Sequence, residues 1–120
     1  MIIKLDWPNA KLAPNRANGK AWYGVAAIKA KAREDAFVLA KNAAILSEDK
    51  YTTTRRYALR ITFLAPDKRR RDIDGCLSSL KSALDGIALA MGVDDSQFRP
   101  IHLDYKASIK PGFVLVEVLA

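Results

Sequence analysis

The sequence predicts an α+β fold, a single domain over residues 1–120 with one mixed sheet and two helices in the order β-α-β-α-β-β. Four short segments alternate apolar and polar residues, which is typical of half-buried strands. Two longer segments place apolar residues three or four positions apart, which is typical of helices. A length of 120 residues fits one domain and leaves little room for a second.

In the first half, alternation from Ile3 to Trp7 predicts a strand, and the Pro- and Asn-rich residues 8–20 predict a loop. A helix is expected from Trp22 to about Leu46. Its buried stripe would consist of Val25, Ile28, Ala32, Ala36, Leu39, Ala43 and Leu46. A second strand follows from Tyr57 to Phe63 and ends before Pro66.

In the second half, a helix is expected from Asp72 or Asp74 to Met91, ended by Gly92. Residues 101–105 alternate as a third strand, and Phe113–Leu119 forms a fourth after a turn at residues 110–112. We expect this last strand to pair antiparallel with the third. Because it is apolar on both sides except at Glu117, both of its faces should be covered.

The charge is distributed unevenly. The chain carries a net charge of +7, and residues 1–60 hold twelve of its 20 Lys and Arg but five of its 13 acidic residues. A basic surface is typical of proteins that bind polyanions, although a merely solvated basic surface is the alternative. Seven Asp residues lie in the second half, and carboxylates repel phosphates unless a cation lies between them.

The compartment is predicted to be the cytoplasm. The single Cys76 cannot form an internal disulfide, and no Cys or His cluster indicates zinc. The first residues do not form a signal peptide, and no apolar run is long enough for a bilayer, so no membrane partner is expected. No motif indicates a small-molecule cofactor.

The strongest local signal is the run Lys68–Arg71, followed by Asp72 and Asp74 and, twenty residues later, by Asp94-Asp95. Mg²⁺ prefers one or two carboxylates together with water and substrate phosphate. Asp95 would join the first two if residues 98–106 pair near residues 57–64. The alternatives are that Asp72 or Asp74 is only a helix N-cap, that Asp94-Asp95 is a solvated turn, and that the basic run is a solvated loop.

These segments resemble the central motif of the RusA family of Holliday-junction resolvases. The family pattern is a basic turn, Asp-x-Asp-Asn, a lysine, an apolar helix and Asp-Asp-x-Gln. The matching stretches here are Pro66–Asp74, Leu84–Ile87 and Val93–Gln97, and Leu5–Asn9 is also similar. The resemblance implies a homodimer that binds four-way junction DNA and nicks two opposed strands with Mg²⁺ or Mn²⁺. It also implies that Asp72, Asp74 and Asp95 hold the metal.

Two positions depart from that pattern. Gly75 replaces the Asn, and Ser78 stands where the family has its lysine, with Lys81 one turn later. We hypothesise that Lys81 takes the lysine's catalytic role, and the alternative is that Lys81 only pairs with Asp85. The expected DNA contacts are Lys68, Arg69, Arg70, Arg71, Arg16, Lys20, Lys11, Arg55 and Arg56.

The predicted function is therefore a metal-dependent, structure-selective DNA endonuclease that resolves Holliday junctions in recombination and repair. Two alternatives stay open. One is a non-catalytic basic DNA-binding module, which would need the cations but not the acidic cluster. The other is a nuclease that acts on another branched DNA or on RNA.

Overall fold

The computed structural model describes residues 1–13 and 24–119. It confirms a single α+β domain with one mixed four-stranded sheet and the element order β-α-β-α-β-β. In chain order the elements are β1 (Ile2–Asp6), the short 3-10 helix η1 (Ala10–Leu12), α1 (Val25–Ser47), β2 (Leu59–Leu64), α2 (Ile73–Ser79), α3 (Lys81–Met91), the 3-10 helix η4 (Asp95–Gln97), β3 (Ile101–Lys106) and β4 (Phe113–Val118).

The strand order is β1-β4-β2-β3, and it corrects one prediction. β4 does not pair with β3 but lies antiparallel between β1 and β2, whereas β3 pairs parallel with β2. A central strand needs apolar side chains toward the core, and β4 supplies Val114, Val116 and Val118. The half-exposed β3 takes the edge, where a covered face is not required.

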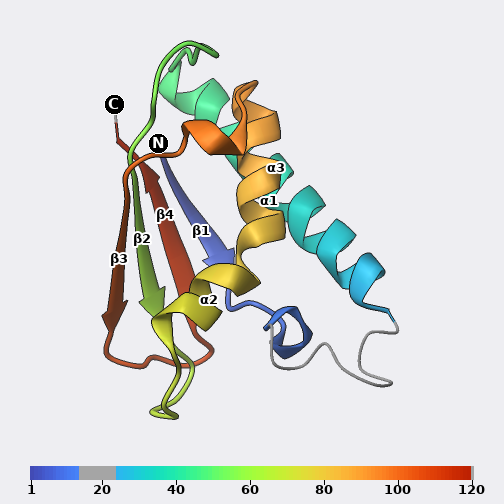
Figure 1. The fold of residues 1–120 in the computed structure, drawn as a ribbon, viewed down its shortest axis with the longest axis vertical. Coiled ribbons are helices and arrows are strands. Elements are labelled where there is room, and N and C mark those ends of the chain that lie inside the picture. The colour runs from blue at the N-terminus through green and yellow to red at the C-terminus, as the bar shows by residue number, and fades with distance from the viewer. Residues whose placement is uncertain (14–23, 120) are drawn as a thin grey trace.

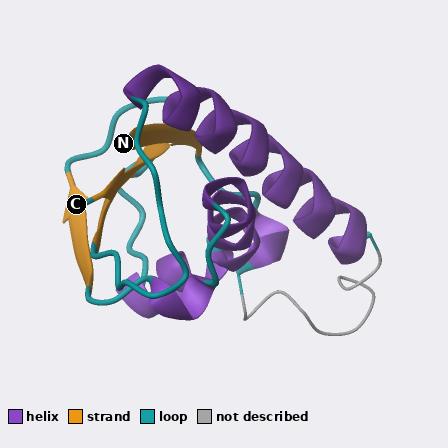
Figure 2. Cartoon of the chain, turned by 90° about the horizontal axis from the view of Figure 1, so that it is seen from above, coloured by secondary structure: helices purple, strands orange, loops and turns teal. Residues whose placement is uncertain are grey.

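The helices lie on one side of the sheet (Figures 1 and 2). α1 packs along α3 and also approaches β1. The core between sheet and helices includes the fully buried side chains of Leu59, Ile61, Phe63, Leu80, Ile87, Val114 and Val116. The opposite sheet face has no helix over it among the described residues, and Phe113 and Leu115 there stay half-buried. The described chain therefore covers one face of the last strand itself, and the expected cover of the other face would have to come from a second copy.

The buried stripe of α1 also differs from the predicted one. Ala36 and Ala40 are fully buried, whereas the predicted Leu39 and Leu46 are 42% and 85% exposed. Small residues occupy the contact because α1 and α3 approach closely at Gly86, which has no side chain to separate them. The larger Leu39 and Leu46 therefore lie outside this interface.

The single helix expected from Asp72 or Asp74 to Met91 is broken at Leu80. The hydroxyl of Ser79 donates to the carbonyl of Cys76 at 2.6 Å, and the Leu80 N–H turns to the carbonyl of Leu77 at 3.0 Å. A side-chain hydroxyl that donates a hydrogen bond to a helical carbonyl in this way is a known cause of a bend in the helix. The predicted burial of Cys76 is confirmed. No helix in residues 1–13 and 24–119 is long and apolar enough to cross a membrane.

Candidate nucleic-acid and metal site

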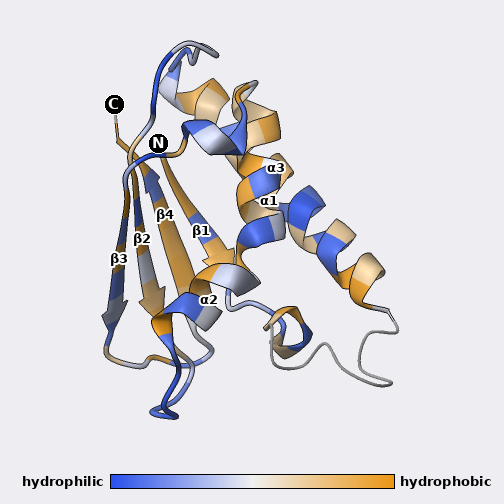
Figure 3. Ribbon diagram, in the orientation of Figure 1, coloured by the Kyte–Doolittle hydropathy of each residue, from blue (hydrophilic) through white to orange (hydrophobic). Residues whose placement is uncertain are grey.

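The site is built on the loop that joins β2 to α2. This loop is hydrophilic, in contrast to the apolar β4 beside it (Figure 3). Asp67 begins it with a tight turn, because its carboxylate accepts the Arg69 N–H at 2.9 Å. The side chains of Lys68, Arg69 and Arg70 are then exposed, and the chain enters α2 through Asp72.

Asp72 and Asp74 are both exposed at the start of α2. Asp72 occupies the N-cap position, but its side chain accepts no capping hydrogen bond. One oxygen of Asp74 accepts the Gly75 N–H at 2.9 Å. Both carboxylates thus keep oxygens that no residue of the described chain occupies, and such oxygens are the ligands that Mg²⁺ or Mn²⁺ requires. The donor set fits a hard divalent cation.

A groove of about 620 Å³ brings the two aspartates and the cations together. It is lined by Asp72 and Asp74, by Arg69, Arg70 and Arg71, and by segments from elsewhere that include Trp7, Asn9, Ser78 and Ser79. Arg69 and Arg70 are exposed beside the two aspartates, whereas Arg71 is paired with Asp67. The chemistry of the groove suits a phosphate that is bound by arginines beside a carboxylate-held cation.

Asp95 does not lie at this groove. In Figure 1, α2 starts at the lower end of the molecule, and the turn near residue 95, orange in the colour scale, lies at the upper end. α3 alone has 11 residues and is about 16 Å long. Carboxylates that share one metal must lie within a few ångströms of each other. In the described residues no group of three metal-binding side chains forms. The three predicted ligands are therefore not brought together within one chain.

The direction of strand pairing explains this separation. β3 does pair with β2, as the prediction required, and Leu59 lies opposite Ile101. The two strands are parallel, however, so the start of β3 lies beside the start of β2. Asp95 precedes β3, whereas Asp72 follows the end of β2, and one strand length of about 20 Å lies between those ends.

The Asp94–Gln97 turn is held by its own side chains. Asp94 caps η4 by accepting the Ser96 N–H at 3.1 Å, and the amide oxygen of Gln97 accepts the Asp94 N–H at 2.9 Å. The Gln97 amide nitrogen donates to the carbonyls of Thr52 at 2.9 Å and Arg55 at 2.7 Å. Asp94 is thus a capping residue, and Gln97 joins this turn to the loop that carries Arg55 and Arg56.

Asp95 instead interacts with Asp85 of α3. Burial raises the pKa of Asp85, and the neighbouring carboxyl of Asp95 raises it further, while Lys81 and Arg33 act in the opposite direction. Lys81 therefore lies near Asp85 and does not line the groove of Asp72 and Asp74. Ser78, at the position of the family's lysine, does line that groove. The break at Leu80 is the reason that the expected reach of Lys81 toward Asp74 is not realised.

The other predicted DNA contacts are dispersed. Lys11 is exposed in η1, and Arg55 and Arg56 are exposed in the loop before β2. Arg16 and Lys20 lie outside the described residues. Trp7 packs edge-on against Phe63 at 6.1 Å and, together with Asn9, also lines the groove. Both Trp7 and Asn9 belong to the stretch Leu5–Asn9 that resembles the family, and this resemblance was the signal that connected them with the site.

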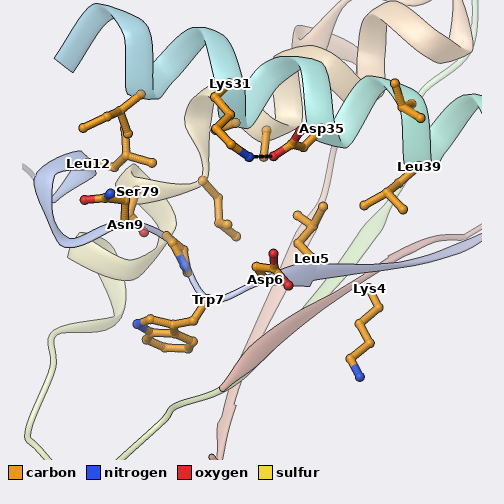
Figure 4. Close-up of a pocket in the computed structure, with 16 residues that line it drawn as sticks. Lys4, Leu5, Asp6, Trp7, Asn9, Leu12, Lys31, Asp35, Leu39 and Ser79 are labelled. Atoms are coloured by element: carbon orange, nitrogen blue, oxygen red, sulfur yellow. Dashed lines mark hydrogen bonds and ion pairs between the residues drawn. The ribbon is translucent and has the colours of Figure 1, made fainter. Parts of the chain in front are cut away.

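A second groove, of about 670 Å³, lies between β1 and α1 (Figure 4). Lys31 donates to Asp35 at 2.6 Å along its α1 wall, and Lys4 and Asp6 line the β1 side. Two lysines and two aspartates line it, and none of the site residues expected from the sequence is among its described lining residues.

The chain was compared with known proteins. No protein-family model matches it, and no curated protein matches it either.

Proposed function

We propose that this protein is a metal-dependent, structure-selective DNA endonuclease that resolves four-way junctions by paired nicking in DNA recombination and repair. The observation that carries the proposal is the groove in which Asp72 and Asp74 stand beside exposed arginines. A binding module without catalysis has no use for two carboxylates that face the phosphates it must attract.

The roles of the residues follow from their chemistry. Asp72 and Asp74 would hold Mg²⁺ or Mn²⁺, which activates a water and neutralises charge at the scissile phosphate when bound. Lys68, Arg69 and Arg70 would bind the phosphates on either side of that position. Trp7, at the groove wall, would limit how far the strand can enter.

A site with three aspartates requires two copies of the chain. In the same chain, the turn that carries Asp95 and the start of α2 lie at opposite ends of the molecule (Figure 1). In the homodimer that the resemblance implies, two-fold symmetry permits each copy to supply Asp95 to the other copy's Asp72 and Asp74. We include this arrangement in the proposal because it uses all three aspartates of the motif.

The test compares cleavage of a synthetic four-way junction, a linear duplex, a DNA flap and an RNA hairpin, each with Mg²⁺ and with chelator. We expect Mg²⁺-dependent paired nicks in the junction alone. Asp72→Asn and Asp74→Asn should lower cleavage by at least about 100-fold while junction binding persists, because a lost ligand costs more than a lost outer partner. Asp94→Asn is the matched control, because Asn also caps helices well.

Each alternative function has its own outcome in the same assay. Junction binding that is unchanged by chelator, without cleavage of any substrate, would replace the proposal with a DNA-binding module. Preferential cleavage of the flap or of the RNA hairpin would keep the metal site and replace the junction as the substrate.

A further inference from the structure

The guanidinium of Arg71 is half-buried and paired within the chain, unlike the three cationic side chains that precede it. The side chain of Arg71 is 18% exposed, whereas Lys68, Arg69 and Arg70 are exposed to solvent. One terminal nitrogen donates to the Asp67 carboxylate at 2.9 Å. The other donates to the Tyr105 hydroxyl at 3.2 Å and to the Arg69 carbonyl at 3.1 Å.

The same guanidinium also lies over the ring of Trp7. Its central carbon lies 5.2 Å from the centroid of the Trp7 ring, within the range of a cation–π contact. Trp7 follows β1, Asp67 follows β2 and Tyr105 belongs to β3. Arg71 therefore connects segments from three strands, β1, β2 and β3, whose carboxyl ends lie at the same end of the sheet.

These contacts fix the point from which the metal ligands project. Asp72 is the next residue after Arg71, and Asp74 belongs to the first turn of α2. The loop before them is otherwise held by the Asp67 turn, while Lys68, Arg69 and Arg70 stay exposed. A metal site binds well only when its ligands are held in place by surrounding contacts.

We propose that Arg71 is a positioning residue: it holds the β2–α2 loop against the end of the sheet at which β1, β2 and β3 end, so that Asp72 and Asp74 face the groove. Arg71 is then not a phosphate contact. The inference rests on the proposed metal-dependent function. It differs from the sequence-based expectation, which counted Arg71 among the DNA contacts. Arginine suits the task because one planar fork binds several acceptors while its face stacks on a ring.

The experiment replaces Arg71 itself in one set of variants and removes its partners in another. Tyr105→Phe deletes one hydroxyl, and Asp67→Asn removes one negative charge but keeps the oxygen that the Arg69 N–H needs. Binding of Mn²⁺ alone to the full chain is measured by electron paramagnetic resonance of the free ion. Thermal melting followed by circular dichroism shows that each variant is folded.

We expect Arg71→Ala to weaken Mn²⁺ binding by about tenfold, the lower end of the loss seen for outer partners of metal ligands. Tyr105→Phe and Asp67→Asn should change Mn²⁺ binding in the same direction. Arg71→Lys should not restore it, because an ammonium lacks the planar fork. The control Arg70→Ala should leave Mn²⁺ binding unweakened.

Junction binding in chelator provides the second measurement. A lost phosphate contact lowers the slope of log affinity against log salt by about 0.9. We expect that reduction for Arg70→Ala and an unchanged slope for Tyr105→Phe and Asp67→Asn. If Arg71 were a phosphate contact, Arg71→Ala would instead lower the slope by about 0.9, as Arg70→Ala does, and that result with unchanged Mn²⁺ binding would overturn the inference.

Failure of the proposed function gives a different result. A wild-type chain that binds no Mn²⁺ and cleaves no substrate would overturn the metal site and the role of Arg71 together. A wild-type chain that binds Mn²⁺, with variants that bind it equally well, would overturn only the role of Arg71.

Discussion

Gly86 of α3 lies against the backbone of Arg33 in α1. A methyl group at Gly86 would stand 3.0 Å from the carbonyl carbon of Arg33 and 3.1 Å from the nitrogen of Phe37. Neither atom can move without a shift of the whole helix. Gly86 thus sets the distance between α1 and α3, and Ala36 and Ala40 fit that distance.

We predict that Gly86→Ala destabilises the protein by about 1–3 kcal/mol, the usual cost of an overpacked contact. Urea denaturation measures the change. Gly75→Ala in α2 is the matched control, since nothing lies within 4 Å of the added methyl group. That control should gain about 0.5–1 kcal/mol from the higher helix propensity of alanine. Equal stability of Gly86→Ala and wild type would show that the helices separate more easily than we infer.

Mixing of subunits tests where Asp95 acts. One chain carries Asp72→Asn and Asp74→Asn, and the other carries Asp95→Asn. We expect each variant alone to be inactive and a refolded mixture to nick one strand of the junction, because each mixed dimer has one complete set of three aspartates. A mixture that stays inactive while Asp95→Asn alone is also inactive would place Asp95 in the same-chain site. Full activity of Asp95→Asn alone would remove Asp95 from the mechanism.

The same mixture locates the action of Lys81. Lys81 lies near Asp85, which interacts with Asp95. If Lys81 acts with Asp95, Lys81→Ala should lower the single-turnover rate at least tenfold, or about 1.4 kcal/mol, only when it is placed on the chain that keeps Asp95. On the chain with Asp95→Asn it should have no effect. Ser78→Ala, in the groove of Asp72 and Asp74, is the companion variant. A rate that is insensitive to Lys81→Ala on either chain would make this lysine structural.

Stability should depend on pH through Asp85. Burial and the nearby Asp95 raise the pKa of Asp85, so the folded chain holds this proton to a higher pH than the unfolded chain does. Stability therefore falls as pH rises through the folded pKa. Asp85→Asn should raise Tm by about 2 °C at pH 7, which is less than the Tm shift expected for a stability change of 1 kcal/mol. At pH 3 the rise in Tm should be smaller, because Asp85 is then protonated and uncharged as well. Melting curves at the two pH values measure this, and an advantage that is larger at pH 3 would reverse the sign we assign.

The sequence predicted the elements better than their contacts. Alternation identified the four strands, because each has one face against the core. Periodicity could not predict that Ala40 rather than Leu39 would face α3, since that choice depends on the close approach at Gly86. The pairing of β4 also depends on competition among strands, which no local pattern records.

The candidate site was predictable in part for the same reason. Asp72, Asp74 and the arginines are adjacent in sequence, so their groove follows from local structure. The place of Asp95 depends on whether β2 and β3 run in the same direction. The half-buried position of Arg71 depends on Trp7 and Tyr105, which are distant in sequence.

The central place of β4 constrains how this protein can be made. β1 contacts the rest of the sheet through β4 alone, so residues 2–6 have no strand partner until residues 113–118 have left the ribosome. Until then β1 and one edge of β2 expose unpaired backbone groups, a state that favours aggregation. The sheet therefore completes after synthesis of this domain rather than during it. Slower elongation should give little benefit to its folding yield, whereas chaperones that shield an open sheet edge should raise it.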